Sequence, residues 1–194
     1  MRDSETGNEK PNVIGRKYLT TDEVHRLIGA AGKVGRQGER DKLLLTLIYR
    51  HGLRVSEAVD LRWSDFDLET PKNRTLHVRR LKGSKDSVHT LEPDTVGMLK
   101  RLHAETDGHY VFRSERGGPL SVDAVQLICK RAGELAGLPF RVHPHQLRHA
   151  CGFFLAEEGV DTRLIQSYLG HASISNTVIY TETSARRLAS IRVR

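Results

Sequence analysis

Two histidines, an arginine and a tyrosine follow one another at short intervals near the C-terminal end of the chain. His145 precedes Arg148 by three residues, His171 comes directly after Gly170, and Tyr180 lies nine residues further on. Residues three apart are neighbours on a helix surface, so His145 and Arg148 can act on one group. An arginine fork suits phosphate oxygens, and a histidine at hydrogen-bonding distance can move protons or hold those oxygens. With Tyr180 as a candidate covalent nucleophile, the set predicts phosphoryl transfer.

The tyrosine can play this part only with cationic or basic neighbours. An unperturbed phenol has a pKa of about 10, so roughly one molecule in a thousand is ionised at neutral pH. His143, His145 and His149 crowd the predicted start of a helix. The positive end of the helix dipole disfavours imidazolium there and favours anions. The cluster therefore predicts a bound anion such as phosphate.

The same three histidines leave a second interpretation open. The spacing of His143, His145 and His149 could supply nitrogen ligands to zinc, as in a metal hydrolase. The acidic residues Glu157 and Glu158 lie two or more turns away, and an arginine among the ligands would repel a cation. We therefore expect no metal at this site.

Two cations earlier in the chain are further candidates. Arg54 lies between Gly52, which is predicted to end one helix, and a short second helix. It would add a second guanidinium to the phosphate, although arginines at helix ends often only satisfy carbonyl groups. Lys82 lies in a predicted turn between two strands, where a lysine is either merely solubilising or delivers an ammonium group onto a leaving oxygen. Neither residue is specific by itself.

Composition and charge favour a polyanionic partner. The chain has 194 residues, a net charge of +7 and a pI of about 9.6, with 38% hydrophobic residues. This length fits one domain with a sizeable core. Because no basic amphipathic helix with an aromatic face stands out, nucleic acid is favoured over a membrane surface. In the basic stretch around the predicted hairpin, the residues expected to contact the phosphate backbone are Arg79, Arg80 and Lys85.

The chain lacks the marks of export or membrane insertion. Its polar N-terminus is no signal peptide, and its longest apolar run, residues 43–49, is too short to cross a bilayer. The two cysteines, Cys129 and Cys151, have neither disulfide nor metal spacing and are expected to be buried thiols. We expect a cytoplasmic protein.

The pattern of apolar residues predicts an α+β fold that is mainly α, with a small antiparallel sheet at one edge. Residues 1–17 lack periodicity and are expected to form a disordered tail, and residues 18–194 one domain. Strands are expected at 75–80 and 87–91, with a turn into a strand at 63–68. Val111 and Phe112 are expected in a short strand or an extended core segment. Helices are expected to begin at Thr20 or Thr21, at Arg40, after the cap Ser56, at Asp94, after Ser121, at Pro144, after the cap Asp161 and after Ser173 or Ser175.

Together these motifs resemble the catalytic domain of tyrosine recombinases, the phage integrase family. The family pattern is Gly-Leu-Arg-x-Ser-Glu, a hairpin lysine, His-x-x-Arg, Leu-Gly-His and a following tyrosine, and it occurs here in order from about residue 18 to the C-terminus. The segment from His143 to Tyr180, especially residues 161–166, is similar to the short Fim-type DNA invertases, which flip a promoter segment. Those proteins lack an N-terminal core-binding domain, and we expect the same of this chain.

The resemblance implies a site-specific recombinase that cuts and rejoins DNA through a 3′-phosphotyrosyl intermediate. Tyr180 would attack a phosphodiester, while Arg54 and Arg148 hold the non-bridging oxygens. Lys82 would act as general acid for the leaving 5′-oxygen, and His145 would take the tyrosine proton. His171 would orient the phosphate or assist proton transfer.

The resemblance also implies the partners. They are double-stranded DNA with paired recombination sites, three further copies of the chain in a homotetramer, and accessory proteins that bend DNA. No cofactor is implied, and the chain would be associated with the bacterial nucleoid. The event would be inversion or integration of a DNA segment. The alternatives are a DNA-binding regulator without catalysis and strand cleavage of the type IB topoisomerase kind.

Overall fold

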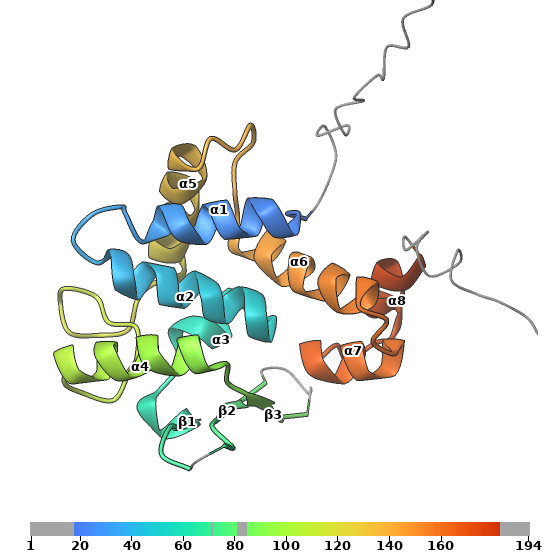
Figure 1. The fold of residues 1–194 in the computed structure, drawn as a ribbon, viewed down its shortest axis with the longest axis horizontal. Coiled ribbons are helices and arrows are strands. Elements are labelled where there is room, and N and C mark those ends of the chain that lie inside the picture. Colours follow the sequence, from blue (N-terminus) through green and yellow to red (C-terminus); the bar gives the residue numbers. More distant parts are fainter. Residues whose placement is uncertain (1–17, 71, 81–84, 183–194) are drawn as a thin grey trace, which may run out of the picture.

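The computed structural model describes residues 18–70, 72–80 and 85–182, which form a helical body with a small sheet at one edge (Figure 1). Its strands β1 (Phe66–Asp67), β2 (Thr75–Val78) and β3 (Ser87–Thr90) form one antiparallel sheet in the order β1-β2-β3. A 3₁₀ turn, Trp63–Asp65, leads into β1. The predicted fold class is confirmed. The helices are α1 (Thr21–Ala31), α2 (Gly38–His51), α3 (Val55–Val59), α4 (Pro93–Glu105), α5 (Val122–Leu135), α6 (Pro144–Glu157), α7 (Thr162–Leu169) and α8 (Ser175–Glu182).

Local sequence signals account for most helix ends. A capping box joins Thr20 and Glu23 at the start of α1, because the Thr20 amide donates to Glu23 Oε2 at 2.8 Å and the Glu23 amide to Thr20 Oγ1 at 3.3 Å. Asp161 Oδ1 accepts the Arg163 amide at 2.8 Å at the start of α7. Helices α2 and α7 both end at a glycine in the left-handed conformation, Gly52 (φ 56°) and Gly170 (φ 63°).

The predicted cap of α3 is wrong by two residues. The N-cap is Arg54, and Ser56 lies inside the helix. The reason is Glu57, whose Oε2 accepts the Arg54 amide at 2.8 Å and so fixes the first turn at Arg54. Val111 and Phe112, expected in a short strand or an extended core segment, form a bend between two isolated bridges. Both are fully buried, and the Val111 amide donates to Leu61 O at 2.9 Å.

Two clusters of buried side chains hold the described residues together. The larger one joins α1, α2, α4 and α5 with β2, and it includes Leu44, Leu76 and Phe112. The smaller one joins the second half of α6 to α7 and α8, and Tyr180 belongs to it. Helix α6 packs on α2 as well as on α7 and α8, and it therefore contributes buried side chains to both clusters.

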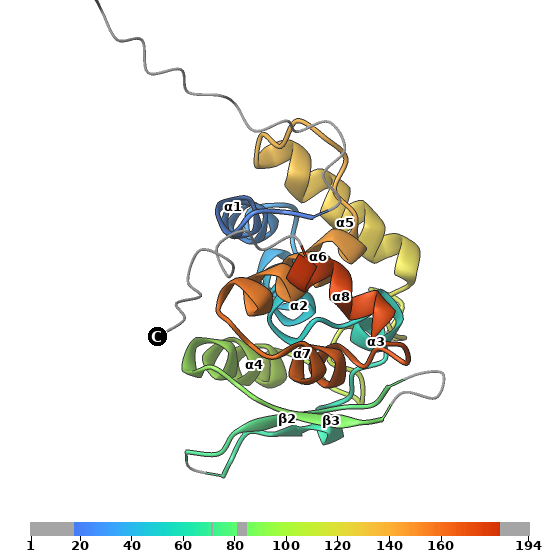
Figure 2. The same cartoon turned by 90° about the vertical axis from the view of Figure 1, so that its right-hand side faces the viewer.

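The arrangement brings distant segments to one end of the molecule. Figure 1 shows α1, α2 and α4 side by side, and Figure 2 shows β2 and β3 along the edge beneath α4 and α7. The start of α3, the ends of α2 and α7, and the middle of α6 meet there. The predicted tail 1–17 and the hairpin turn with Lys82 lie outside the described residues. Within the described part, no helix is both long and apolar enough to span a membrane.

Candidate active site

Arg148 lies inside α6 and points into the protein. The residue is 2% exposed. Its Nη2 donates to Leu169 O at 2.7 Å, and its Nη1 donates to Gly52 O. Both acceptors are carbonyls at helix C-termini, which carry the negative end of the helix dipole. Burial, aided by the charge of Arg54, lowers the pKa of Arg148 to about 10, so its guanidinium remains cationic at neutral pH.

Arg54 reaches the same place from the junction of α2 and α3. Its Nη2 donates to Gly170 O at 3.0 Å, and its Nη1 pairs with Glu57 Oε1 at 2.7 Å. The side chain is 34% exposed, in contrast to the enclosed Arg148. The two arginines predicted from widely separated motifs are therefore brought together, one buried and one open to solvent.

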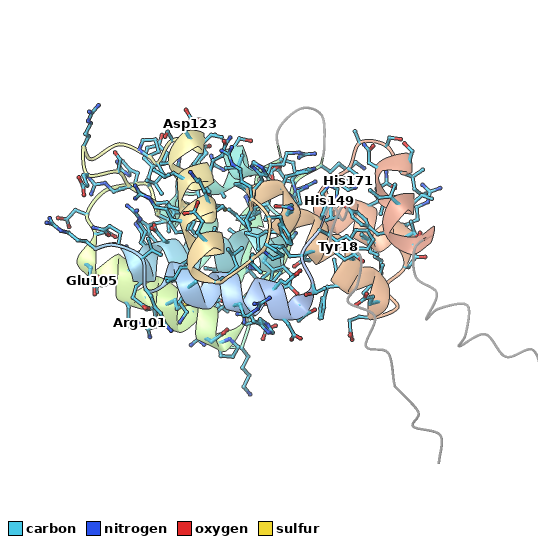
Figure 3. The ribbon with its side chains drawn as sticks, turned by 90° about the horizontal axis from the view of Figure 1, so that it is seen from above. Tyr18, Arg101, Glu105, Asp123, His149 and His171 are labelled. Carbon is cyan, nitrogen blue, oxygen red and sulfur yellow. The ribbon has the colours of Figure 1, made fainter. Side chains whose placement is uncertain are left out.

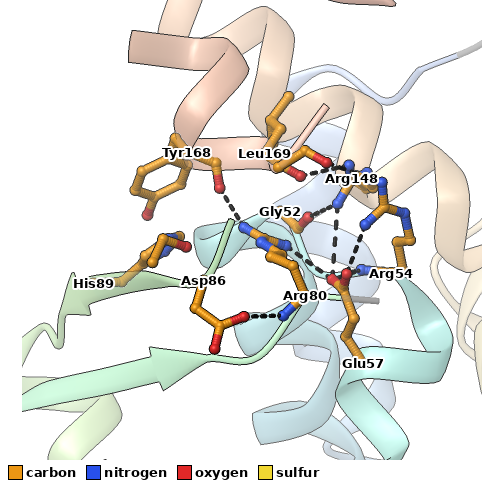
Figure 4. Close-up of polar contacts among 11 residues, drawn as sticks. Gly52, Arg54, Glu57, Arg80, Asp86, His89, Arg148, Tyr168 and Leu169 are labelled. Carbon is orange, nitrogen blue, oxygen red and sulfur yellow. Dashed lines mark hydrogen bonds and ion pairs between the residues drawn. The ribbon is translucent and has the colours of Figure 1, made fainter. Parts of the chain in front are cut away.

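Glu57 is the shared partner of these arginines (Figure 4). Its side chain is 1% exposed, and its Oε2 lies 2.8 Å from Arg80 Nη1 and 3.9 Å from Arg148 Nη1. One carboxylate thus faces three guanidinium groups, which leaves a surplus of positive charge. Because the buried surplus has little water to screen it, the cluster is suited to bind an anion. Glu57 is the glutamate of the Gly-Leu-Arg-x-Ser-Glu motif, for which no role was predicted. Its position three residues after Arg54 is the sequence signal that indicates this contact.

Arg80 differs from the expected phosphate contact. Its guanidinium is completely enclosed: Nη1 bonds Glu57 and Nη2 donates to Tyr168 O. Burial lowers its pKa and the Glu57 charge opposes that shift. The side chain turns inward because the carboxylate and the α7 carbonyl both lie beneath the end of β2. The prediction that Arg80 contacts the phosphate backbone of DNA is therefore wrong. Arg80 instead links the end of β2 to Glu57 in α3 and to Tyr168 in α7.

The other predicted DNA contacts remain on the surface. Arg79, the neighbour of Arg80, is 40% exposed and pairs with Asp65 at 2.8 Å. Lys85 is exposed at the start of the described part of the second hairpin arm. Lys82 lies outside the described residues, so its place in the site stays a prediction.

His171 follows the glycine that ends α7 and is half-buried. Its Nδ1 lies 2.9 Å from Thr177 Oγ1, and its amide bonds Gln166 O at 3.0 Å, which fixes the ring between α7 and α8. Burial, together with the charges of Arg148 and Arg54, lowers the pKa of His171 to about 4. The ring is therefore neutral at physiological pH, so one ring nitrogen can donate a hydrogen bond and the other can accept one.

His145 and His149 stand one turn apart on α6. Their ring centroids are 4.3 Å apart. His145 is exposed, and its pKa is lowered by partial burial and by Arg148 and Arg54. His149, which was predicted only as a member of the histidine cluster at an anion or a zinc ion, is the histidine whose Nδ1 lies 3.0 Å from the Tyr180 hydroxyl. Figure 3 shows His149 and His171 at the same end of the molecule, opposite Arg101 and Glu105.

Tyr180 lies on α8 with its ring packed on α6. The residue is 1% exposed, and burial raises its pKa to about 12, against a lowering by Arg148. Phe153 meets the ring edge-on at 5.0 Å and His171 stacks at 6.1 Å between centroids. The ring lies so close to Gly152 that a Cβ there would be 2.6 Å from Tyr180 Cζ. Because of this raised pKa, the phenol is protonated at neutral pH, and its hydroxyl faces the imidazole of His149.

The arrangement brings two guanidinium groups, two imidazoles and a phenol together, a set that can chemically bind an anion and remove the proton of the phenol. Arg54, Arg148, His171 and Tyr180 come from four separate segments and converge at one end of the molecule. In the described part of the chain, no three histidine, cysteine or acidic side chains are grouped so that they could hold a metal ion. The three histidines of the zinc alternative are all described and do not form such a group.

Comparisons with known proteins agree with this geometry. The phage integrase family profile matches residues 17–187. The Type 1 fimbriae regulatory protein FimE of Escherichia coli strain K12 is 43% identical over 185 residues, which are 91% of this chain and 90% of FimE.

Solved structures show the same fold. A crystal structure of XerA recombinase has a TM-score of 0.75 and 32% identity, over 89% of this chain and 62% of that one. XerH site-specific recombinase bound to its difH substrate, a pre-cleavage complex, has a TM-score of 0.77 and 28% identity. That match covers 91% of this chain and 54% of XerH. This chain therefore spans less than two thirds of both recombinases.

Proposed function

This chain belongs to the phage integrase family and is a site-specific tyrosine recombinase, and we propose that Tyr180 is its nucleophile. In this proposal Tyr180 Oη attacks a phosphodiester of double-stranded DNA and displaces the 5′-oxygen, leaving a 3′-phosphotyrosyl bond. A 5′-hydroxyl of another strand then attacks that bond and rejoins the DNA. The energy of the broken ester is kept in the phosphotyrosine, so the joining step needs no ATP.

The observation that carries the assignment is that Arg54 and Arg148 meet at the end of α7, and that the charge of Arg148 acts on Tyr180. Both guanidiniums are held by helix-terminal carbonyls and by Glu57, so they are oriented before any phosphate arrives. Preorganised charge of this kind stabilises the transition state, because the arginines need not be reorganised as negative charge grows on the phosphoryl oxygens. A single arginine contributes roughly 10³ to 10⁵ in rate in other phosphoryl-transfer enzymes. We assign both arginines to the non-bridging oxygens and His171 to the same phosphate.

Lys82 is proposed as general acid for the 5′-oxygen on the family resemblance. Arg79 and Lys85 are proposed as contacts to the DNA backbone. The support for this is that both side chains are exposed, and that Arg79 and Lys85 lie on either side of Lys82 in the sequence.

The proposed event is inversion of a DNA segment. Its support is the match to FimE, which extends over most of both chains. We further propose that the chain acts as a homotetramer on paired sites, with DNA-bending accessory proteins, and that it is cytoplasmic and associated with the nucleoid.

The test is covalent trapping on nicked DNA. Duplex fragments from the DNA that flanks the gene, each carrying a nick, release a short strand after cleavage and so preserve the adduct. We expect a protein–DNA adduct that maps to Tyr180, survives EDTA and is absent from the Tyr180→Phe variant. The matched control is Tyr110→Phe, which removes a hydroxyl from another partly buried tyrosine. Site-specific binding without an adduct would instead indicate a regulator, and relaxation of plasmids without paired sites a topoisomerase.

A further inference from the structure

The hydroxyl of the nucleophile is in contact with His149. Tyr180 Oη lies 3.0 Å from His149 Nδ1, whereas the role of base was expected for His145. His145 is exposed, and its ring packs against His149 at 4.3 Å between centroids. Among these three rings, His149 is therefore the one that lies between the phenol and the exposed imidazole.

The contact has the geometry of proton transfer. A general base must lie within hydrogen-bonding distance of the proton that it takes, and 3.0 Å meets that condition. A phenol that donates to Nδ1 requires a neutral imidazole with its proton on Nε2. The rings that pack on this pair include His145 from α6 and His171 from the end of α7, and the charge of Arg148 acts on Tyr180. Arg148 and Arg54 also disfavour a positive charge on His145 and on His171, the two imidazoles beside the pair.

The position of the ring is imposed by its neighbours. Phe153 and His171 pack on Tyr180, and Gly152 leaves no room on the α6 side of the ring. The tyrosine hydroxyl is therefore aimed at His149 by packing as well as by the hydrogen bond. Burial of the phenol also raises its pKa to about 12, which makes a base necessary for attack.

We propose that His149 is a catalytic residue that takes the proton of Tyr180 as its oxygen attacks the DNA phosphorus. This rests on the proposed role of Tyr180 as nucleophile. The Oη–P bond forms as the P–O5′ bond breaks; the Oη proton moves to His149 Nδ1, and the leaving 5′-oxygen is protonated by the general acid. The exposed His145 then lies where it can pass the charge to solvent.

The primary variant is His149→Asn, compared with the wild type in single-turnover cleavage of the nicked duplex. Asparagine places an amide oxygen near the position of Nδ1, so it keeps a hydrogen-bond acceptor and loses the base. We expect the cleavage rate to fall by roughly 10² to 10⁴, with unchanged DNA affinity. The exposed His109→Asn is the matched control, and His145→Asn is measured beside it. If His149→Asn is poorly folded, His149→Gln takes its place.

Two substitutions separate a base from a structural residue. A fluorinated tyrosine at position 180, whose phenol has a lower pKa, should restore most of the rate lost in His149→Asn. A substrate with sulfur in place of the 5′-bridging oxygen, which needs no general acid, should not restore it. Restoration of His145→Asn by fluorotyrosine, without restoration of His149→Asn, would overturn the proposal.

Other outcomes are equally decisive. Wild-type cleavage by His149→Asn would overturn the role of His149 and leave the proposed function intact. A wild-type chain that forms no adduct through Tyr180 would overturn both.

Discussion

At the scale of single residues, the candidate site contains three arginines whose hydrogen-bond acceptors are one carboxylate and the carbonyl groups at two helix ends. Arg54, Arg80 and Arg148 each bond a carbonyl at the end of α2 or α7, and Glu57 pairs with Arg54 and Arg80 and lies 3.9 Å from Arg148. A buried ion pair adds little net stability, but removing one partner leaves the other charge uncompensated. The cluster therefore ties the orientation of the arginines that we propose to bind phosphate to the folding of the domain.

The neighbours Arg79 and Arg80 should behave differently when neutralised. Arg80→Gln removes the buried hydrogen bonds to Glu57 and to Tyr168 O, while Glu57 keeps its bond to Arg54, and it should lower the free energy of unfolding by about 1–3 kcal/mol. Arg79→Gln breaks a surface pair and should cost less than about 1 kcal/mol. Urea unfolding at neutral pH measures both.

DNA binding should be affected in the opposite way: Arg79→Gln should change its salt dependence and Arg80→Gln should not. If Arg79 contacts a phosphate, Arg79→Gln should reduce the slope of log affinity against log salt by about 1. Arg80→Gln, if folded, should keep the wild-type slope. Equal stabilities, or a changed slope for Arg80→Gln alone, would contradict the burial of Arg80 described above.

At the scale of elements, α6 determines where α8 can lie. Gly152 is the point of closest approach, because a Cβ there would meet three atoms of the Tyr180 ring at 2.6–2.9 Å. The backbone of α6 is held by its contacts with α2, so the ring and α8 would have to move. A glycine is therefore needed at this position for packing, although it lowers the intrinsic stability of the helix.

Gly152→Ala should displace α8 and prevent adduct formation through Tyr180. Overpacking costs about 1–3 kcal/mol, which outweighs the gain of helix propensity. The control is Gly29→Ala in α1, where no atom lies within 4 Å of the added methyl group. That variant should be stabilised by about 0.5–1 kcal/mol and should cleave normally. Melting temperatures and adduct yields of the two variants test this; a stabilised and active Gly152→Ala would contradict it.

The contact between α2 and the sheet contains two buried histidines that should make folding sensitive to acid. His51 and His89 face each other at 5.4 Å between ring centroids, and His89 stacks on Tyr168 at 3.9 Å. Burial, with added repulsion from Arg50 and Arg80, lowers the pKa of His51 to about 4. Burial and the neighbouring His51 lower the pKa of His89 to about 3. Both rings are neutral in the folded protein at physiological pH.

The free energy of unfolding should fall as the pH drops below about 6.5. Between that pH and the lowered values the unfolded chain binds more protons, so each histidine costs about 1.4 kcal/mol per pH unit, and its full contribution is present only above about 6.5. Urea unfolding at pH 7.5 and 5.5 measures the loss. In His51→Leu this loss of unfolding free energy between pH 7.5 and 5.5 should be smaller by about 1.4 kcal/mol. The control is His109→Gln, because His109 is exposed. An unchanged loss in His51→Leu would show that His51 titrates normally.

At the scale of the whole molecule, the excess of basic residues should act as a diffuse attraction for DNA. The net charge is +7, and the arginine cluster around Glu57 concentrates part of this positive charge at one place. Each phosphate that the protein neutralises releases counterions, so binding weakens as salt is added.

Affinity for double-stranded DNA should therefore fall steeply with salt. For six to ten phosphate contacts, the loss between about 50 and 200 mM salt is roughly 10³ to 10⁵. Fluorescence anisotropy with a labelled duplex gives the slope. A binding constant indifferent to salt would mean that the basic surface does not face the DNA backbone.

The sequence by itself determined the helical class and the small sheet, and it named the candidate residues of the site. Those depend on local signals: Gly52 and Gly170 end helices, Thr20 and Asp161 begin them, and motif spacing is visible without a structure. These effects act within a few residues, so they can be read along the chain.

The tertiary structure alone decided direction and partnership. It turned Arg80 inward, made Glu57 the common partner of the arginines and placed His149, in preference to His145, at the Tyr180 hydroxyl. Each of these contacts joins residues far apart in the sequence, or selects one of two equivalent neighbours. Such choices depend on which surfaces are buried when α6, α7 and α8 pack together, and spacing along the chain does not contain that information.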